Sequence, residues 1–181
     1  MKNIIFPADA VYHSLTHFEV LDSAIRKQLQ DAGFDDTQID AQLLVPGSKF
    51  FSSFAASPQM VVDRLKMFFP SQFINAQPEL DGRIRLSFDC GEYIGNQNVV
   101  EEQALTDCEK RTIREDIRNG CPVRTVRMER VIPTRMCQLI LTMQNDTGYL
   151  CSLFPGELAP PLPCSENGVL DPYWRTHLFL R

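Results

Sequence analysis

The 181-residue chain lacks several features that would assign a protein class directly. No apolar run approaches the roughly 20 residues that a membrane-spanning helix needs, so no membrane partner is expected. The N-terminus has one lysine, a short apolar stretch and an early proline, Pro7, which makes it a poor signal peptide. These absences favour a cytoplasmic location.

Signature motifs of nucleotide and hydrolase chemistry are also missing. The chain contains no G-x-S-x-G, no G-x-x-x-x-G-K-[ST] and no G-x-G-x-x-G. Phosphoryl transfer from nucleotides and α/β-hydrolase chemistry are therefore disfavoured. We expect no cofactor.

The six cysteines lie well apart and include no C-x-x-C pair. Cys137 and Cys151 flank a predicted hairpin and could approach each other. Because no export signal is evident, we expect reduced thiols, mostly buried as small residues.

The composition is that of a globular protein with a slightly acidic surface. Hydrophobic residues make up 44% and charged residues 23%, which argues against a disordered chain. The formal net charge is -5, so any nucleic-acid site must be a local basic patch. The length suits a single domain, residues 1–181.

The first third of the sequence predicts helices. Apolar residues recur at three- and four-residue steps over 11–33, and Gly33 suits a helix stop. A shorter helix is expected over 37–44. Ser57 and Pro58 form an N-cap and first helical position, opening a helix to about residue 69.

The later part predicts a sheet. Residues 83–90 alternate polar and apolar side chains, as a half-buried strand does. Residues 124–131 predict another strand, and a hairpin follows from Cys137 with its turn at 145–148.

Two further helices are predicted in this part. Thr106 and Glu109 match a capping box, which predicts a helix from there to about residue 120. Asp171 and Pro172 predict the start of a short terminal helix through YWRTHLFL.

Together these elements predict an α+β fold. N-terminal helices (1–78) pack on a mostly antiparallel, sheet-rich part (79–181) that carries a C-terminal hairpin and a short terminal helix.

Two of the three histidines, His13 and His17, are four residues apart on one predicted helix face. That spacing lets two imidazoles share a metal ion. However, Ser14 stands where a zinc-protease helix carries its glutamate, and no third ligand is evident, so no metal site is expected. The remaining alternatives are a catalytic or RNA-facing pair and a structural one.

The segment 110–135 is locally basic in an acidic protein, with eight lysine and arginine residues. Arginine forks suit phosphate and carboxylate oxygens alike. The segment is either a phosphate or RNA surface or a solvated face of Arg–Glu pairs. His177, three residues after Trp174, either packs or serves as an acid or base. Acidic residues such as Glu101 and Glu102 form no recognisable catalytic pair.

Several segments together resemble the metal-independent ribonuclease toxins of the barnase, EndoU, colicin and RelE type. These segments are GEYIG, Lys110-Arg111, residues 127–134, LFPGELAPPLP and the terminal YWRTH. The resemblance covers roughly 90–180. It implies helices packed on a twisted antiparallel sheet whose face holds RNA.

The resemblance also implies a mechanism, in which an RNA 2′-hydroxyl attacks its adjacent phosphate without a metal. His17 is the expected base, with His13 as a substitute or substrate contact, and His177 the expected acid. Phosphate contacts are expected from Arg127, Arg130, Lys110 and Thr134, and base stacking from Phe154.

The expected partners are RNA and an inhibitor or other protein. The alternative function is a non-enzymatic protein-interaction module that uses the hairpin and the proline-rich loop, with an apolar patch over 154–162.

Overall fold

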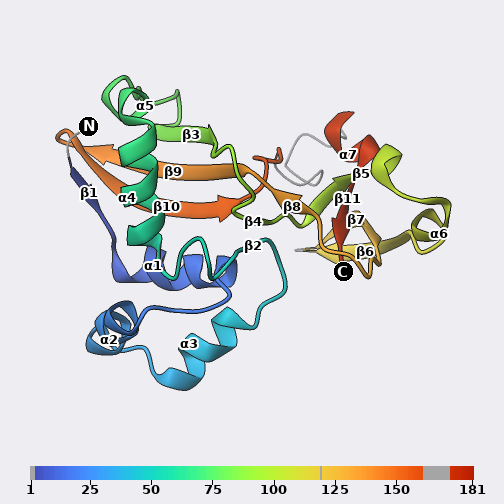
Figure 1. Ribbon diagram of the computed structural model, residues 1–181, viewed down its shortest axis with the longest axis horizontal. Coiled ribbons are helices and arrows are strands. Elements are labelled where there is room, and N and C mark those ends of the chain that lie inside the picture. The colour runs from blue at the N-terminus through green and yellow to red at the C-terminus, as the bar shows by residue number, and fades with distance from the viewer. Residues whose placement is uncertain (1–2, 119, 161–171) are drawn as a thin grey trace. The chain divides into compact units, whose positions relative to one another are not determined.

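A computed structural model describes residues 3–118, 120–160 and 172–181 (Figure 1). The chain divides into two compact units, each assembled from two separate segments. Unit 1 is Met1–Asn96 with Pro133–Glu157, and unit 2 is Gln97–Ile132 with Leu158–Arg181. The predicted division between the helical and the sheet-rich part, at 78/79, lies inside unit 1.

Unit 1 combines helices with two sheets, whose strand orders are β1-β10-β9-β3 and β2-β4-β8. Its elements in chain order are β1 (Asn3–Ile5), α1 (Ala8–Ser14), the 3₁₀ turn Leu15–His17, α2 (Ser23–Asp31), α3 (Asp36–Leu43), β2 (Lys49–Phe50), α4 (Pro58–Phe68), α5 (Pro70–Ile74), β3 (Arg83–Asp89), β4 (Gly95–Asn96), β8 (Pro133–Thr134), β9 (Met136–Gln144) and β10 (Thr147–Pro155). All pairings within these sheets are antiparallel except that of β1 with β10.

Helix α4 lies across one face of the larger sheet (Figure 1). The predicted cap is confirmed, because the Ser57 side chain accepts a hydrogen bond from Met60 N and proline follows at the first helical position. The apolar side of the helix, including Val61 and Leu65, is buried in one cluster with Leu139 and Leu141 of β9. This cluster is the main core of unit 1.

The predicted hairpin is confirmed as β9 and β10, which occupy the centre of the larger sheet. Its turn is tighter than expected. Asn145 and Asp146 alone connect the strands, with φ of 48° and 63°. A two-residue hairpin turn with both residues at positive φ matches the twist of the strands, and Asn and Asp tolerate that conformation.

The long N-terminal helix predicted over 11–33 is interrupted. Helix α1 ends at Ser14, and α2 begins only after Asp22, whose side chain accepts from Ala24 N. Between them Phe18 is extended, fully buried and bridged to Phe50. Burial of this aromatic ring outweighs the local helical periodicity.

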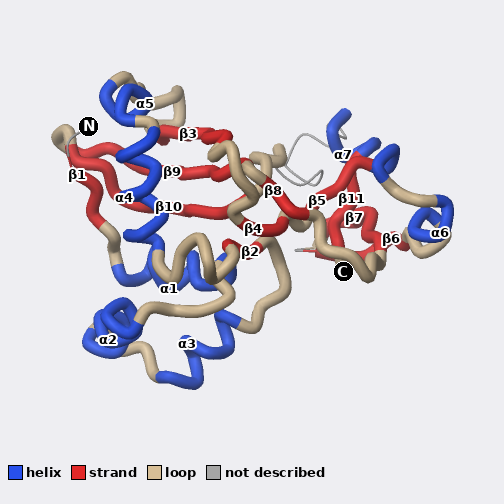
Figure 2. The backbone as a smooth tube through the Cα atoms, in the orientation of Figure 1, coloured by secondary structure: helices blue, strands red, loops and turns tan. Residues whose placement is uncertain are grey.

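Unit 2 is a smaller α+β unit with one sheet of order β5-β11-β7-β6. Its elements are β5 (Val99–Glu101), the 3₁₀ turn Glu102–Ala104, α6 (Asp107–Lys110), β6 (Arg114–Arg118), β7 (Cys121–Val126), α7 (Pro172–Thr176) and β11 (His177–Leu180). Strand β11 pairs antiparallel with β5 and parallel with β7. Figure 2 shows helices and strands in both units, and the α+β prediction is confirmed.

Three boundaries predicted in unit 2 are wrong. The capping box at Thr106 and Glu109 forms, but its helix ends at Lys110, and the residues expected to continue it form β6. The terminal helix ends at Thr176, after which the chain becomes β11. The strand predicted over 124–131 is β7, which starts at Cys121 and ends at Val126. The predicted cap Asp171 lies outside the described residues. In each case pairing with a neighbouring strand overrides local propensity.

The expectation of reduced thiols is wrong at Cys121. Cys121 is disulfide-bonded, whereas Cys90, Cys108, Cys137 and Cys151 are free. The expectation came from the N-terminal segment, which carries no information on which cysteines lie within bonding distance.

None of the described helices combines the length and the apolar composition that crossing a bilayer requires.

Gly95 occupies a crowded backbone position in unit 1. Its strand β4 lies between β2 and β8, and a Cβ added at Gly95 would lie 2.3 Å from the Lys49 carbonyl oxygen. The neighbouring atoms belong to the backbone of Lys49 and Phe50, so no side chain can rotate away. Only glycine lets β2 and β4 approach this closely.

We therefore expect Gly95→Ala to destabilise unit 1 by about 3 kcal/mol, because the strands must separate. Urea unfolding followed by circular dichroism measures the loss. Gly47→Ala is the matched control, since no atom lies within 4 Å of the added Cβ there. Equal stability of the two variants would contradict the close approach of β2 and β4.

Candidate functional site

The predicted site residues fall into two groups. His13, His17, Thr134 and Phe154 belong to unit 1, whereas Lys110, Arg127, Arg130 and His177 belong to unit 2.

In unit 1, the structure brings His17 and Phe154 together, with ring centroids 5.6 Å apart. His17 Nδ1 lies 2.9 Å from Ser48 O and 3.2 Å from Ser48 Oγ. Lys49 holds the same region by donating from Nζ to the carbonyl oxygens of Thr16 (3.0 Å) and Leu43 (2.6 Å). His17 is therefore a packed residue that is held by its contacts with Ser48.

Burial lowers the pKa of His17 to about 4, although its hydrogen bond to Ser48 O acts in the opposite direction. The charges of His13 and Lys49 lower the pKa further. The imidazole is therefore neutral at pH 7.

The other two unit 1 residues are differently placed. His13 is exposed on α1. Thr134 is buried in β8, and its hydroxyl oxygen accepts a hydrogen bond from Met136 N at 3.1 Å. The Thr134 hydroxyl is therefore engaged with the backbone of the chain two residues further on.

The apolar patch predicted over 154–162 is described only to residue 160. Phe154 is half-buried, Pro155 and Gly156 are buried, and Leu158 is 43% exposed. The hairpin that leads into this segment, β9 and β10, forms the centre of the larger sheet.

In unit 2, the register of β5 and β11 places His177 directly opposite Glu101. Directly opposed residues of antiparallel strands have Cβ atoms about 5 Å apart, on the same face of the sheet. His177 Nε2 accordingly lies 3.8 Å from Glu101 Oε1. The backbone pairing alone therefore creates a carboxylate–imidazole couple.

The other side of the His177 ring is held by α7. Nδ1 lies 2.9 Å from the Tyr173 carbonyl oxygen, and the Tyr173 ring stacks on the imidazole at 3.6 Å between centroids. Thr176 Oγ1 lies 3.0 Å from the same Nδ1, so α7 holds this side of the ring through two oxygens. Nε2 is the nitrogen that faces Glu101.

The couple adjoins an open hollow of about 420 Å³. Glu101, Glu102, Gln103, Lys110 and Thr176 line it. Glu101 is 45% exposed, while His177 is only 13% exposed. A ligand in the hollow therefore meets the Glu101 carboxylate and the Lys110 side chain, and the imidazole contacts this carboxylate.

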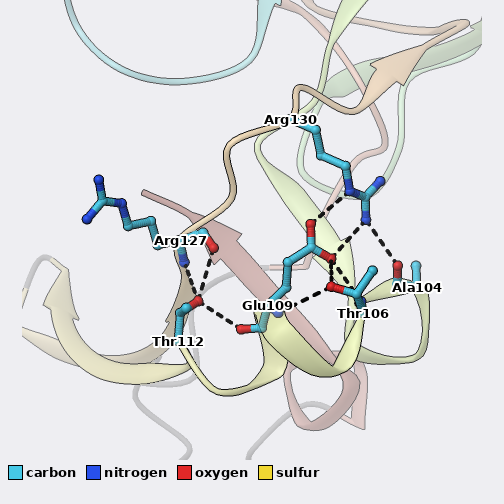
Figure 3. A network of polar contacts seen from close by, with 6 residues as sticks. All are labelled: Ala104, Thr106, Glu109, Thr112, Arg127 and Arg130. Atoms are coloured by element: carbon cyan, nitrogen blue, oxygen red, sulfur yellow. Dashed lines mark hydrogen bonds and ion pairs between the residues drawn. The ribbon is translucent and has the colours of Figure 1, made fainter.

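A second polar cluster of unit 2 is built around Glu109 and Arg130 (Figure 3). Arg130 donates to Glu109 through Nε (2.8 Å) and Nη2 (3.2 Å), and Nη2 also donates to Ala104 O (3.2 Å). The Arg130 guanidinium, together with hydrogen bonds from Thr106, lowers the pKa of Glu109 to about 2. Glu109 therefore stays ionised and holds Arg130 in place.

Arg127 is held through its backbone. Thr112 Oγ1 accepts from Arg127 N at 3.1 Å and lies 3.0 Å from Arg127 O. Figure 3 shows the Arg127 guanidinium pointing away from Glu109 and Arg130. The two arginines still line one hollow of about 500 Å³.

The charge of the chain is unevenly divided between the units. Unit 2 contains nine lysine and arginine residues and nine aspartate and glutamate residues, whereas unit 1 has nine and fourteen. Within the described residues, Lys110, Arg111 and Arg127 form no ion pair with a carboxylate. Unit 2 thus offers unpaired cations without the net negative charge of unit 1.

No three His, Cys, Asp or Glu side chains gather closely enough to hold a metal ion in the part of the chain that the structure describes. Comparison of the chain with protein-family models, with curated proteins and with solved structures gave no match.

Sequence reasoning did not identify Glu101 and Tyr173 as partners of His177. The apolar pair Val99-Val100 before Glu101, and the alternation after Thr176, are weak strand signals over three and four residues. They become informative only once the two strands are known to pair.

The low pKa of His17 makes stability depend on pH. The unfolded chain, with an ordinary histidine pKa near 6.5, binds more protons than the folded chain between pH 6.5 and about 4. The contribution of neutral His17 to the free energy of unfolding is therefore complete above pH 6.5. It decreases by about 3 kcal/mol at most as the pH falls from 6.5 to about 4.

We expect His17→Asn, whose amide also donates to Ser48 O, to flatten the fall in stability between pH 6.5 and 4. Urea unfolding at a series of pH values measures it. His13→Asn, at the exposed neighbouring histidine, should keep the wild-type slope. An unchanged slope in His17→Asn would show that His17 is not held neutral by burial.

Proposed function

We propose that unit 2 binds single-stranded RNA and cleaves it by metal-independent transesterification. The observation that carries the proposal is the β5–β11 register, which sets His177 Nε2 3.8 Å from Glu101 Oε1 beside the hollow that Lys110 lines. The ribonuclease-toxin resemblance covers roughly residues 90–180, which include this couple.

The reaction needs a base, an acid and positive charge at the phosphate. Ionised Glu101 accepts the proton of the RNA 2′-hydroxyl, and the 2′-oxygen bonds to the adjacent phosphorus. Protonated His177 gives the Nε2 proton to the 5′-oxygen as the P–O5′ bond breaks. The products are a 2′,3′-cyclic phosphate and a 5′-hydroxyl.

Glu101 replaces His17 as the proposed base for two reasons. It belongs to the same unit as His177 and faces it across the strand pair. Its carboxylate is also 45% exposed and lines the hollow, where Gln103 Nε2 donates to its Oε2.

The other roles follow from charge and orientation. The contact of Nδ1 with Tyr173 O holds the imidazole beside Glu101, which lines the hollow. The Lys110 ammonium, at the end of α6, lies where it can bind a non-bridging phosphate oxygen, and its charge opposes the negative charge that grows in the transition state.

Cleavage of a fluorogenic RNA by the intact protein tests the roles of these residues. We expect His177→Ala and Glu101→Gln each to lower kcat by about 100-fold or more, and Lys110→Ala to lower kcat/KM by about 100-fold. His13→Ala, at an exposed residue of unit 1, is the control and should keep wild-type activity.

Two results would oppose the proposal. One is RNA cleavage by the wild type that His177→Ala and Glu101→Gln leave unchanged. The other is absence of cleavage by a wild-type protein that is folded by circular dichroism. Binding of RNA without cleavage would reduce the proposal to an RNA-binding unit.

A further inference from the structure

The hydroxyl of Thr176 has no reacting role in the RNA chemistry proposed above. Thr176 is the last residue of α7 and His177 is the first residue of β11, so the change from helix to strand falls between them. Thr176 Oγ1 lies 3.0 Å from His177 Nδ1, and Thr176 is exposed and lines the hollow beside this histidine. A hydroxyl within hydrogen-bond distance of an imidazole can act as a nucleophile, because the imidazole can take its proton.

The other nitrogen of the same ring faces a carboxylate. His177 Nε2 lies 3.8 Å from Glu101 Oε1, and Gln103 Nε2 donates to Glu101 Oε2, which holds the carboxylate from its other oxygen. Hydrolases use a hydroxyl, an imidazole and a carboxylate in this order as nucleophile, general base and orienting group. Either ring nitrogen can accept a proton, so the order of the three groups matters and not which nitrogen faces the hydroxyl.

The carbonyl oxygen of Tyr173 suits the proton transfer that such a reaction needs. It lies 2.9 Å from His177 Nδ1 and 3.2 Å from Thr176 Oγ1. Because a hydroxyl hydrogen rotates about its C–O bond, Thr176 can direct its hydrogen either to this carbonyl or to Nδ1. Once Nδ1 holds the proton, Tyr173 O accepts a hydrogen bond from the new N–H and stabilises the charged ring.

The hollow limits what this nucleophile can attack. Its volume is about 420 Å³, and polar or charged residues line it: Glu101, Glu102, Gln103, Lys110 and Thr176. Such a lining offers little to a long hydrocarbon chain but accommodates a short acyl group. Lys110 brings a positive charge to the same hollow, where it can stabilise the oxyanion of a tetrahedral intermediate.

We infer that Thr176 is the nucleophile of a second activity, the hydrolysis of short-chain carboxylic esters. Thr176 Oγ1 bonds to the acyl carbon while His177 Nδ1 takes the hydroxyl proton. The C–O bond to the alcohol then breaks, and His177 gives the proton to the leaving oxygen. Water attacks the acyl-threonine in the same way, which releases the carboxylic acid and restores the hydroxyl. This activity goes beyond the proposed function and does not depend on RNA cleavage.

Hydrolysis of p-nitrophenyl acetate by the intact protein tests this inference. We expect Thr176→Val, which replaces the hydroxyl by a methyl group of similar size, and His177→Ala each to lower kcat by about 100-fold or more. Thr176→Ser should keep most of the activity, because serine supplies the same oxygen. Thr37→Val, at an exposed threonine of α3, is the matched control and should keep the wild-type rate.

The length of the acyl chain tests the substrate class. The intact protein should hydrolyse p-nitrophenyl decanoate at least about tenfold more slowly than the acetate, because the polar hollow does not stabilise the longer chain. Equal or faster hydrolysis of the decanoate would contradict the assignment to short-chain esters.

Mass spectrometry of the acid-quenched protein locates the acyl group independently of the rate. We expect an acetyl group on the peptide that contains Thr176 in the wild type, and its absence from that peptide in Thr176→Val. Three results overturn the inference: acetyl groups on other residues only, a wild-type rate in Thr176→Val, or no hydrolysis by a wild type that is folded by circular dichroism.

The outcomes separate this inference from the proposed function. Ester hydrolysis through Thr176 in a protein that does not cleave RNA supports the inference and opposes only the proposed function. RNA cleavage without ester hydrolysis overturns the inference and leaves the proposed function standing.

Discussion

The close approach of β2 to Gly95 is the constraint on which the arrangement of the chain depends. Strand β4 can lie between β2 and β8 only because no side chain separates Gly95 from the Lys49 backbone. The β4–β8 pairing then brings Asn96 and Pro133 side by side. The chain leaves unit 1 after Asn96 and re-enters it at Pro133, so the ends of the intervening segment are held together. Residues 97–132 can thus form part of a separate unit while β9 and β10 complete the central sheet of unit 1.

In unit 2, the register of the paired strands determines which side chains lie opposite each other. Strand β11 comes from the end of the chain and pairs with β5 and β7. Its fully buried Leu178 fixes which residues face the core, so the residue before it, His177, must face Glu101 across the ladder. A shift of one residue would separate the carboxylate from the imidazole. The geometry of the proposed chemistry therefore follows from hydrophobic burial at the adjacent position, and α7 then supplies Tyr173 O to the ring.

Local signals in the sequence predicted the helix starts that are set by side-chain caps and the hairpin that is closed by a tight turn. The Ser57-Pro58 start of α4, the capping box at Thr106 and the β9–β10 hairpin all formed as expected. Elements held by distant partners were not predictable. REDIR became β6 because it pairs with β7, and HLFL became β11 because Leu178 is buried between two strands. The candidate site could not be predicted from the sequence for the same reason, because Glu101 and His177 are far apart in the chain and meet only through the β5–β11 pairing.

The central claim is that the Glu101–His177 couple acts on an RNA 2′-hydroxyl. The most direct measurement uses a DNA oligonucleotide with one internal ribonucleotide, incubated with the intact protein and analysed by mass spectrometry. The account predicts a single cut on the 3′ side of the ribonucleotide, leaving a 2′,3′-cyclic phosphate and a 5′-hydroxyl. An uncut oligonucleotide, cutting elsewhere, or products with 5′-phosphate ends would contradict it.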